Sequence, residues 1–422
     1  MKNKNYLNKF LRVRYIMFRF FSKEFLNNFI GLTSVNVIGM LMPIITMPYL
    51  SRVLGADGYG VVLLFSTLSV FMLVIIDYST NITGVRDAAE NIGNPERLNE
   101  IYAKYQRLRL ILTLIYIPLS LLYCYLFFSG NNVWFYLELL IVSALGYYLS
   151  APWFHQGTST LPFFSVVSVS SRLVQLFLIF LVVKNHDSVD MAMRLNAYSF
   201  LLTGVGMYMY RRYRMRIAKS KPHTSIMKDF KEGFDAFIGE FSPNLYSNIP
   251  PLVIGALVSP LIFACYSVAI RITNISGSFQ SIAAKSVYPL VVKGTSSLRL
   301  LLIINLFLSA IPFFSILFFG KEIIGVFLGK GYEQAYIYLM LCSPAIVLYS
   351  ILCSFSYGYF LPKRLDAHFK KISLISSIIP AIIGYPLLHF YEAFGAILML
   401  LLARAFFAGL FVFYYVCLEK KQ

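Results

Sequence analysis

Long apolar segments separated by short polar ones run along the whole chain of 422 residues. A helix needs about 20 mostly apolar residues to cross the hydrocarbon core of a bilayer. Twelve segments have about that length or more: 25–49, 59–84, 105–128, 132–155, 161–183, 193–210, 232–257, 260–284, 300–319, 334–360, 372–389 and 394–417. The pattern therefore predicts an all-α protein with twelve membrane-spanning helices. The least regular segments are 193–210, which is short, and the polar-flecked 232–257 and 260–284.

The composition supports an integral membrane protein. Hydrophobic residues make up 58% of the chain and charged residues only 13%, whereas soluble domains carry about 25% charged residues. The apolar run after Lys23 is long enough to span and lacks a small-x-small cleavage site, so we expect a first helix rather than a cleaved signal. No metal site or cofactor is expected, because all five cysteines lie in apolar segments without a C-x-x-C pair: Cys124, Cys265, Cys342, Cys353 and Cys417.

The positions of lysine and arginine predict the topology. With the N-terminus inside the cell, 29 of the 37 basic residues fall on cytoplasmic segments, five on the opposite side and three within spans. Cytoplasmic loops of membrane proteins carry such an excess. We therefore expect both termini to be cytoplasmic. The same distribution explains most of the net charge of +18 without a nucleic-acid partner.

The longest cytoplasmic segment, 211–231, follows the sixth predicted span and is strongly basic. Its cationic residues include Arg211, Arg212, Arg214, Arg216, Lys219 and Lys221. This segment divides the chain into an N-terminal lobe (1–210), a linker (211–231) and a C-terminal lobe (232–422). Because six is even, both lobes enter the membrane from the same side. Such halves can be related by an axis along the membrane normal, with a transport cavity between them.

Three arginines lie in the middle of apolar segments: Arg172, Arg271 and Arg404. A charge at mid-depth costs at least about 2.5–3.5 kcal/mol on insertion scales, so each should face protein or a water-filled cavity. Three cations at similar depth favour the binding of something negatively charged inside the membrane.

Two of these arginines belong to polar stripes. On the eighth predicted span, polar residues recur at spacings of 4, 3, 4, 3 and 4: Ser267, Arg271, Asn274, Ser278, Ser281 and Lys285. The fifth span repeats the pattern with Ser165, Ser168, Arg172 and Gln175. Such a stripe indicates a helix face toward a cavity or a polar neighbour. The alternative is that these side chains only hold helices together. Arg404, flanked by alanine and phenylalanine, lies on no stripe.

Four acidic residues lie within or beside predicted spans: Asp77, Glu138, Asp235 and Glu240. Acids at such depth can take up protons or sodium as a transporter alternates its access. Alternatively, an acid such as Glu240 only neutralises a neighbouring arginine. The chain has no G-x-x-x-x-G-K-[ST] phosphate loop, so we do not expect it to hydrolyse ATP.

Four blocks of sequence stand out as motifs of exact residues. The first is P-Y-L-S-R-V-L-G-A-D-G-Y-G at 48–60, with Tyr49, Arg52, Gly55 and Gly58. The others are Asp77-Tyr78 with R-D-A-A-E at 86–90, W-F-H-Q-G at 153–157 with Trp153 and Gln156, and Y-S-V-A-I-R-I at 266–272. In this order they resemble the Wzx-type O-antigen flippases, which belong to the polysaccharide transport family of the multidrug/oligosaccharidyl-lipid/polysaccharide (MOP) exporter superfamily. His155 stands where we expect an aromatic residue.

The resemblance implies a two-lobed, MATE-like fold in the bacterial inner membrane. Proteins of this family move undecaprenyl-diphosphate-linked oligosaccharide units from the cytoplasmic to the periplasmic leaflet by alternating access, and we expect the same here, as an ion-coupled antiporter. A polysaccharide polymerase and a chain-length regulator are implied as partners. Arginine recognises phosphate with two parallel hydrogen bonds, so Arg271 and Arg172 are expected to bind the headgroup, with Arg404 and Asn274 as further candidates.

Three alternatives remain. A cationic-drug exporter of the same superfamily should have an acidic cavity, against which the three arginines weigh. Lipid II flippases usually carry two further C-terminal helices. A membrane-embedded polymerase or glycosyltransferase should present a long outside loop, whereas the longest predicted here are 184–192 and 320–333. Because metal-hydrolase, paired-carboxylate and nucleophile motifs are also missing from the sequence, we do not expect an enzyme.

Overall fold

The computed structural model describes residues 23–127, 132–217, 225–292, 297–363 and 365–420, and all regular elements within these ranges are helical. The basic N-terminal segment and two linker cations, Lys219 and Lys221, lie outside the described residues. The first group of helices comprises α2 (Lys23–Asp77), α3 (Val85–Glu90), α4 (Pro95–Phe127), α5 (Val133–Ser150), α6 (Pro152–Gly157), α7 (Leu161–Val182) and α8 (Val189–Met209).

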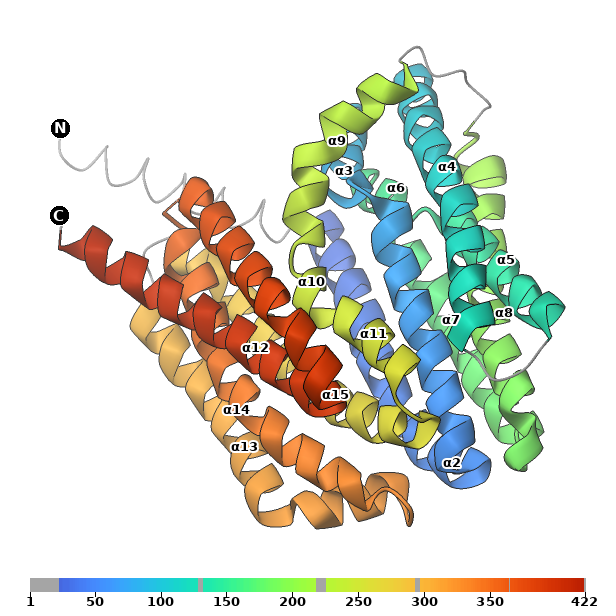
Figure 1. The fold of residues 1–422 in the computed structure, drawn as a ribbon. Helices are drawn as coiled ribbons and strands as arrows, with labels where there is room; N and C mark the ends of the chain where they lie inside the picture. The colour runs from blue at the N-terminus through green and yellow to red at the C-terminus, as the bar shows by residue number, and fades with distance from the viewer. Residues whose placement is uncertain (1–22, 128–131, 218–224, 293–296, 364, 421–422) are drawn as a thin grey trace.

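The remaining helices are α9 (Ile226–Phe241), α10 (Asn244–Ser247), α11 (Ile249–Leu257), α12 (Pro260–Val292), α13 (Leu298–Leu328), α14 (Glu333–Phe355) and α15 (Asp366–Glu419). Figure 1 shows α2 to α8 on one side of the molecule and α12 to α15 on the other. The two groups meet at the bottom of the view and diverge toward the top, where α9 lies. The predicted division into lobes at 211–231 remains a prediction.

Two of the helices are far too long to cross a membrane once. At 1.5 Å per residue, the 55 residues of α2 would extend about 80 Å, against a hydrocarbon core of about 30 Å. The chain turns inside α2 at Gly55 (φ 68°, ψ 176°) and inside α15 at Glu392 (φ 48°, ψ −123°). The backbone angles of Gly55 are open essentially only to glycine. Each helix therefore consists of two arms, visible in Figure 1.

Eight helices of the described ranges are long and apolar enough to cross a membrane, and these include α2 and α15. Neither α8 nor the series α9–α11 is among them. The structure thus supports a helical multi-pass protein, while the count of twelve spans in two lobes of six stays a prediction.

The seventh predicted span, 232–257, is not one helix. It is divided into the end of α9, the single turn of α10, and α11. Proline explains the breaks, because it lacks a backbone N–H and its ring clashes with the preceding turn. Pro243 precedes α10, and Pro250 and Pro251 occupy the first turn of α11.

One predicted boundary also differs from the structure. The outside loop predicted at 320–333 is mostly helix, because α13 bends at Phe319 and continues to Leu328. The fourth predicted span, 132–155, agrees with an apolar helical stretch over Val133–Gly157, which is divided between α5 and α6. There Ala151 adopts a left-handed conformation (φ 42°), and proline at 152 disfavours the α-helical conformation for the residue before it.

Candidate functional site

Arg172 of α7 and Arg271 of α12 line the same cavity, of about 370 Å³. These two residues come from the two groups of helices, and α2 contributes much of the wall between them. Polar side chains on the same wall include Thr46, Ser66, Ser168, Gln175, Asn196 and Thr203. The arrangement brings together two of the three arginines that the sequence singled out, a hundred residues apart in the chain.

Both guanidinium groups are open to a ligand. Among the described residues, neither Arg172 nor Arg271 has a carboxylate or hydrogen-bond partner. Arg172 lies against Gly39 of α2, where a Cβ atom would come within 2.6 Å of its Nη1. The missing side chain at Gly39 therefore gives this guanidinium its room. Two half-buried cations without counter-charges form a wall that attracts anions.

A second cavity, of about 330 Å³, adjoins the first because Arg271 lines both. Its wall also holds Ser267, Asn274 and Ser278 of α12, together with Asn248 beside α11. Four members of the polar stripe on the eighth predicted span thus face a cavity. The prediction of a cavity-facing helix agrees with this geometry for that part of the stripe.

Arg404 of α15 occupies a different position. It is buried and lines neither cavity. Its Nη1 donates to the carbonyl of Ala345 (2.9 Å), its Nη2 donates to Oδ1 of Asn274 (3.1 Å), and its guanidinium lies over the ring of Tyr349. Both terminal nitrogens of the Arg404 guanidinium therefore already donate hydrogen bonds to the protein.

The four candidate acids have different surroundings. Asp77 is buried and paired with Arg109. Glu138 accepts hydrogen bonds from Arg194 and Tyr198, each at 3.2 Å. Asp235 is exposed on α9, and Glu240 of α9 is half-buried without a side-chain partner among the described residues. No group of three His, Cys, Asp or Glu side chains in that part of the chain could hold a metal ion.

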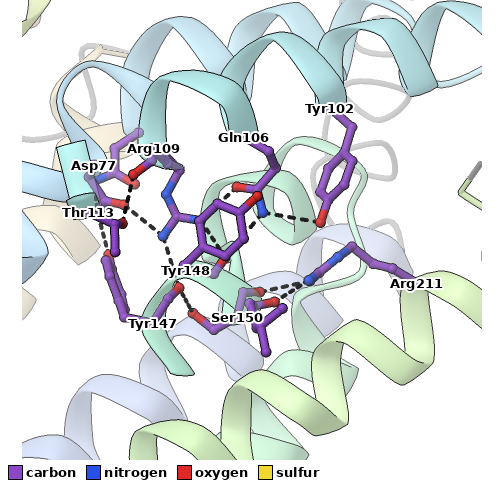
Figure 2. A network of polar contacts seen from close by, with 11 residues as sticks. Asp77, Tyr102, Gln106, Arg109, Thr113, Tyr147, Tyr148, Ser150 and Arg211 are labelled. Carbon is purple, nitrogen blue, oxygen red and sulfur yellow. Dashed lines mark hydrogen bonds and ion pairs between the residues drawn. The ribbon is translucent and has the colours of Figure 1, made fainter. Parts of the chain in front are cut away.

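A buried network at the end of α5 was missed by the sequence reasoning (Figure 2). The last carbonyls of a helix have no partner within it. Arg109 donates to the carbonyls of Tyr147 and Tyr148, each at 3.0 Å, and Arg211 donates to those of Leu149 and Ser150. Two arginines thus cap all four terminal carbonyls, where the helix dipole also favours positive charge.

Asp77 joins this network to α2. Its carboxylate lies 3.5 Å from Nη2 of Arg109 and accepts hydrogen bonds from Tyr147 and Asn81. Arg109 is fully buried and Arg211 nearly so. The charge distribution assigns both to cytoplasmic segments, and the structure adds that both are buried within the protein. The signal was available for Arg109, because Gln106, Arg109 and Thr113 form a polar stripe at the start of the third predicted span.

The first block of family-like sequence lies where the two groups of helices meet. Ser51 donates to the carbonyl of Leu328 (3.2 Å), Arg52 donates to that of Val326, and Tyr332 donates to the carbonyl of Ser51 (3.2 Å). We call these contacts the α2–α13 clasp. Side chains of α2 thereby cap the last turn of α13, whose carbonyls would otherwise lack partners.

Other residues of the blocks pack within the first group of helices. Tyr49 donates to the carbonyl of Val183 (2.6 Å), Gly55 lies against His186 and Gly58 against Val189. Trp153 is fully buried, whereas Gln156 is exposed. These residues of the blocks thus contribute packing and hydrogen bonds within the protein.

His155, at the position where we expect an aromatic residue, contacts two polar side chains. Its Nε2 lies 2.7 Å from Nη1 of Arg211, and its Nδ1 lies 2.8 Å from Oγ1 of Thr160. Since a guanidinium can only donate, Nε2 accepts and Nδ1 carries the proton toward Thr160. The imidazole therefore serves as the neutral partner of a buried cation.

Comparison with known sequences gives a family match and two relatives. The family described as "Polysaccharide biosynthesis protein" matches residues 25–295, more than half of the chain. Proteins of Escherichia coli (strain K12) and Shigella dysenteriae, both named "Putative O-antigen transporter", are similar over almost the whole length. The first is 23% identical over 403 residues (92% of this chain, 95% of the relative), and the second is 19% identical over 382 residues (89% and 96%).

Solved structures of transporters share the fold. A multidrug resistance MATE family transporter of the MOP superfamily in an inward-facing conformation matches with a TM-score of 0.66, 13% identity, and coverage of 92% of this chain and 99% of that one. An outward-facing structure of such a transporter gives 0.55 at 14% identity, covering 94% and 96%. A MOP superfamily transporter of Pyrococcus furiosus gives 0.53 at 15% identity, covering 93% and 95%. At these identities the likeness concerns the fold alone.

Proposed function

From the premise that this chain belongs to the polysaccharide biosynthesis protein family and has a MATE-like fold, we propose that it is a polysaccharide-precursor flippase. Its substrate would be an undecaprenyl-diphosphate-linked oligosaccharide, moved from the cytoplasmic to the periplasmic leaflet of the bacterial inner membrane. The observation that carries the proposal is the shared cavity of Arg172 and Arg271. The two relatives named for O-antigen transport support the substrate class.

The chemistry of the cavity suits a diphosphate. The guanidinium groups of Arg172 and Arg271, unpaired within the part of the chain that the structure describes, can each form parallel hydrogen bonds to phosphate oxygens and keep their charge at any relevant pH. A hydrated headgroup cannot cross hydrocarbon unaided, whereas a polyprenyl tail can remain in the lipid. Alternating exposure of this cavity would move the headgroup without moving the tail through protein. A polysaccharide polymerase and a chain-length regulator would then act on the translocated units.

Purified protein in liposomes tests the proposal. We expect it to move a fluorescent undecaprenyl-diphosphate oligosaccharide between leaflets, as measured by protection from a membrane-impermeant quencher. A cationic drug loaded into the same liposomes should not be exported, because the cavity is cationic. Drug export without movement of the lipid-linked sugar would replace this function by that of a drug exporter.

We infer that the α2–α13 clasp is the closed outer gate of the transporter. The positive-inside rule assigns the Gly55 end of α2 to the outside, and the linker end, where α9 pairs with α4, to the cytoplasm. In this assignment Arg107 and Lys104 of α4, which contact Asp229 of α9 at 2.6 Å and 3.8 Å, lie on the cytoplasmic side. A cavity closed by the clasp would open inward.

Replacing Arg52 by alanine should open the outer gate more often, because the Val326 carbonyl loses its donor. The readout is labelling of Ser66→Cys, a cavity position, by a membrane-impermeant maleimide added outside cells, in a background without native cysteines. We expect labelling to increase several-fold. Arg194→Ala, which removes an arginine outside the clasp, is the matched control and should leave labelling unchanged. Equal labelling in Arg52→Ala and the control would refute the gate.

We propose Glu240 as the residue that couples transport to protons or sodium. Asp77 is held by Arg109 and Glu138 by Arg194, whereas Glu240 keeps an unpaired carboxylate among the described residues. In liposomes with an imposed gradient, Glu240→Gln should make transport insensitive to that gradient, and Glu138→Gln should not. Wild-type transport that ignores both proton and sodium gradients would exclude coupling altogether.

A further inference from the structure

The contact between Arg404 and Asn274 fixes the orientation of an amide at the cavity wall. A guanidinium has only donors, so it must meet the oxygen of the Asn274 amide and not its nitrogen. Nη2 of Arg404 indeed lies 3.1 Å from Oδ1. The assignment of oxygen and nitrogen, which is often ambiguous for asparagine, follows here from chemistry alone.

Arg404 itself is held in place on two further sides. Its Nη1 donates to the carbonyl of Ala345 (2.9 Å), and its guanidinium lies 5.1 Å from the ring centroid of Tyr349. It is buried, while Asn274 is exposed and lines the cavity together with Arg271. Arg404 therefore lies behind the Asn274 amide and does not reach a ligand in the cavity.

The consequence concerns the other end of the amide. With Oδ1 occupied, Nδ2 presents its two N–H donors, and it has no acceptor among the described residues. Asn274 follows Arg271 by three positions on one helix, so the two side chains are neighbours on one face. Together the Arg271 guanidinium and the Asn274 amide nitrogen present hydrogen-bond donors to a ligand at this part of the wall.

We propose that Arg404 is a positioning residue, which does not touch the substrate but makes Asn274 a donor to the oxygens of a diphosphate headgroup. The inference rests on the proposed function and extends it. The N–H donors of Arg271 and Asn274 favour a ligand group that only accepts, such as diphosphate, over an ammonium group, which only donates, while the hydroxyls of the same wall can serve either. Arg271 supplies the charge, and Asn274 supplies the additional neutral donors.

A double-mutant cycle tests the coupling between the two residues. The probe is farnesyl diphosphate, and its dissociation constant is measured with purified full-length protein in nanodiscs. Asn274→Ala should weaken binding about tenfold, the effect of losing a hydrogen bond to a charged group. Arg404→Met should weaken it in the wild-type background and have less than about a twofold effect when Asn274 is already alanine. Arg404→Lys, which can still donate to Oδ1, should restore part of the binding.

Asn274→Asp separates positioning from structural support. Aspartate keeps a partner for Arg404, so thermal stability should be retained, yet it presents no donor and repels phosphate, so binding should fall by more than in Asn274→Ala. Asn185→Asp makes the same charge change at an exposed loop position and should leave the dissociation constant unchanged.

The outcomes are distinct. Additive losses in the cycle would mean that Arg404 acts independently of Asn274 and would overturn the inference while leaving the proposed function intact. Binding by Asn274→Asp equal to wild type would overturn it as well. Failure of the wild-type protein to bind farnesyl diphosphate would overturn both the inference and the proposed function.

Discussion

Replacing Arg271 by alanine is expected to abolish surface polysaccharide in cells that depend on this protein, without reducing the amount of protein in the membrane. Arg271 lines both cavities and has no hydrogen-bond or ion-pair partner among the described residues, so its removal takes little from the fold. Each hydrogen bond to a charged group contributes about 1.5 kcal/mol or more, so two such bonds to phosphate correspond to about a 100-fold loss of affinity.

Two variants sharpen this test. Arg271→Lys keeps the charge but loses the planar pair of donors, so we expect a partial defect. Arg194→Ala removes an arginine that pairs with Glu138 away from the cavity, and normal polysaccharide is expected. Polysaccharide is measured by gel electrophoresis and protein by immunoblot. Normal polysaccharide in Arg271→Ala would exclude Arg271 from headgroup binding.

Replacing Arg109 by alanine is expected to destabilise the protein more than any substitution in the cavity. The change leaves the buried carboxylate of Asp77 without its cation and removes donors from the carbonyls of Tyr147 and Tyr148. Breaking a buried pair by removing one partner costs about 3–5 kcal/mol. The loss is measured as a lower free energy of unfolding in an SDS titration of purified protein.

Controls distinguish the network from the loss of any arginine. Arg86→Ala removes a largely exposed arginine whose nearest carboxylate contact is 3.9 Å long, and its effect should stay below about 1 kcal/mol. The double variant Arg109→Met with Asp77→Asn should recover part of the stability, because no buried charge is then left unpaired. Equal stability of Arg109→Ala and Arg86→Ala would contradict the structural role of this network.

Hydropathy predicted most of the helices but not where they break. The apolar segments at 105–128, 161–183, 193–210 and 260–284 correspond to α4, α7, α8 and α12. The kink at Gly55 and the breaks near Pro243 and Pro250 each depend on one or two residues. Hydropathy is averaged over a window of many residues and therefore does not reveal them. The family resemblance, in contrast, rested on short blocks of exact residues and is confirmed by the family match over 25–295.

Sequence alone determined that Arg172, Arg271 and Arg404 needed polar surroundings, because a charge in the middle of an apolar span is costly when it faces hydrocarbon. It could not determine what those surroundings are. Tertiary structure brought Arg172 and Arg271 to one cavity from helices a hundred residues apart and set Arg404 against Asn274 and Ala345.

The same limit explains why the burial of Arg109 and Arg211 was not predicted from the sequence. Their position near the predicted cytoplasmic ends of spans agreed with the positive-inside rule, so the sequence offered a sufficient explanation for each. Only the packing of α4 and of the helical turn that follows α8 (210–214) against the end of α5 decided that both are buried, where they cap the last carbonyls of α5. The sequence around a residue indicates its depth in the membrane. Its interaction partners, in contrast, come from distant segments and are brought to it only when the helices pack.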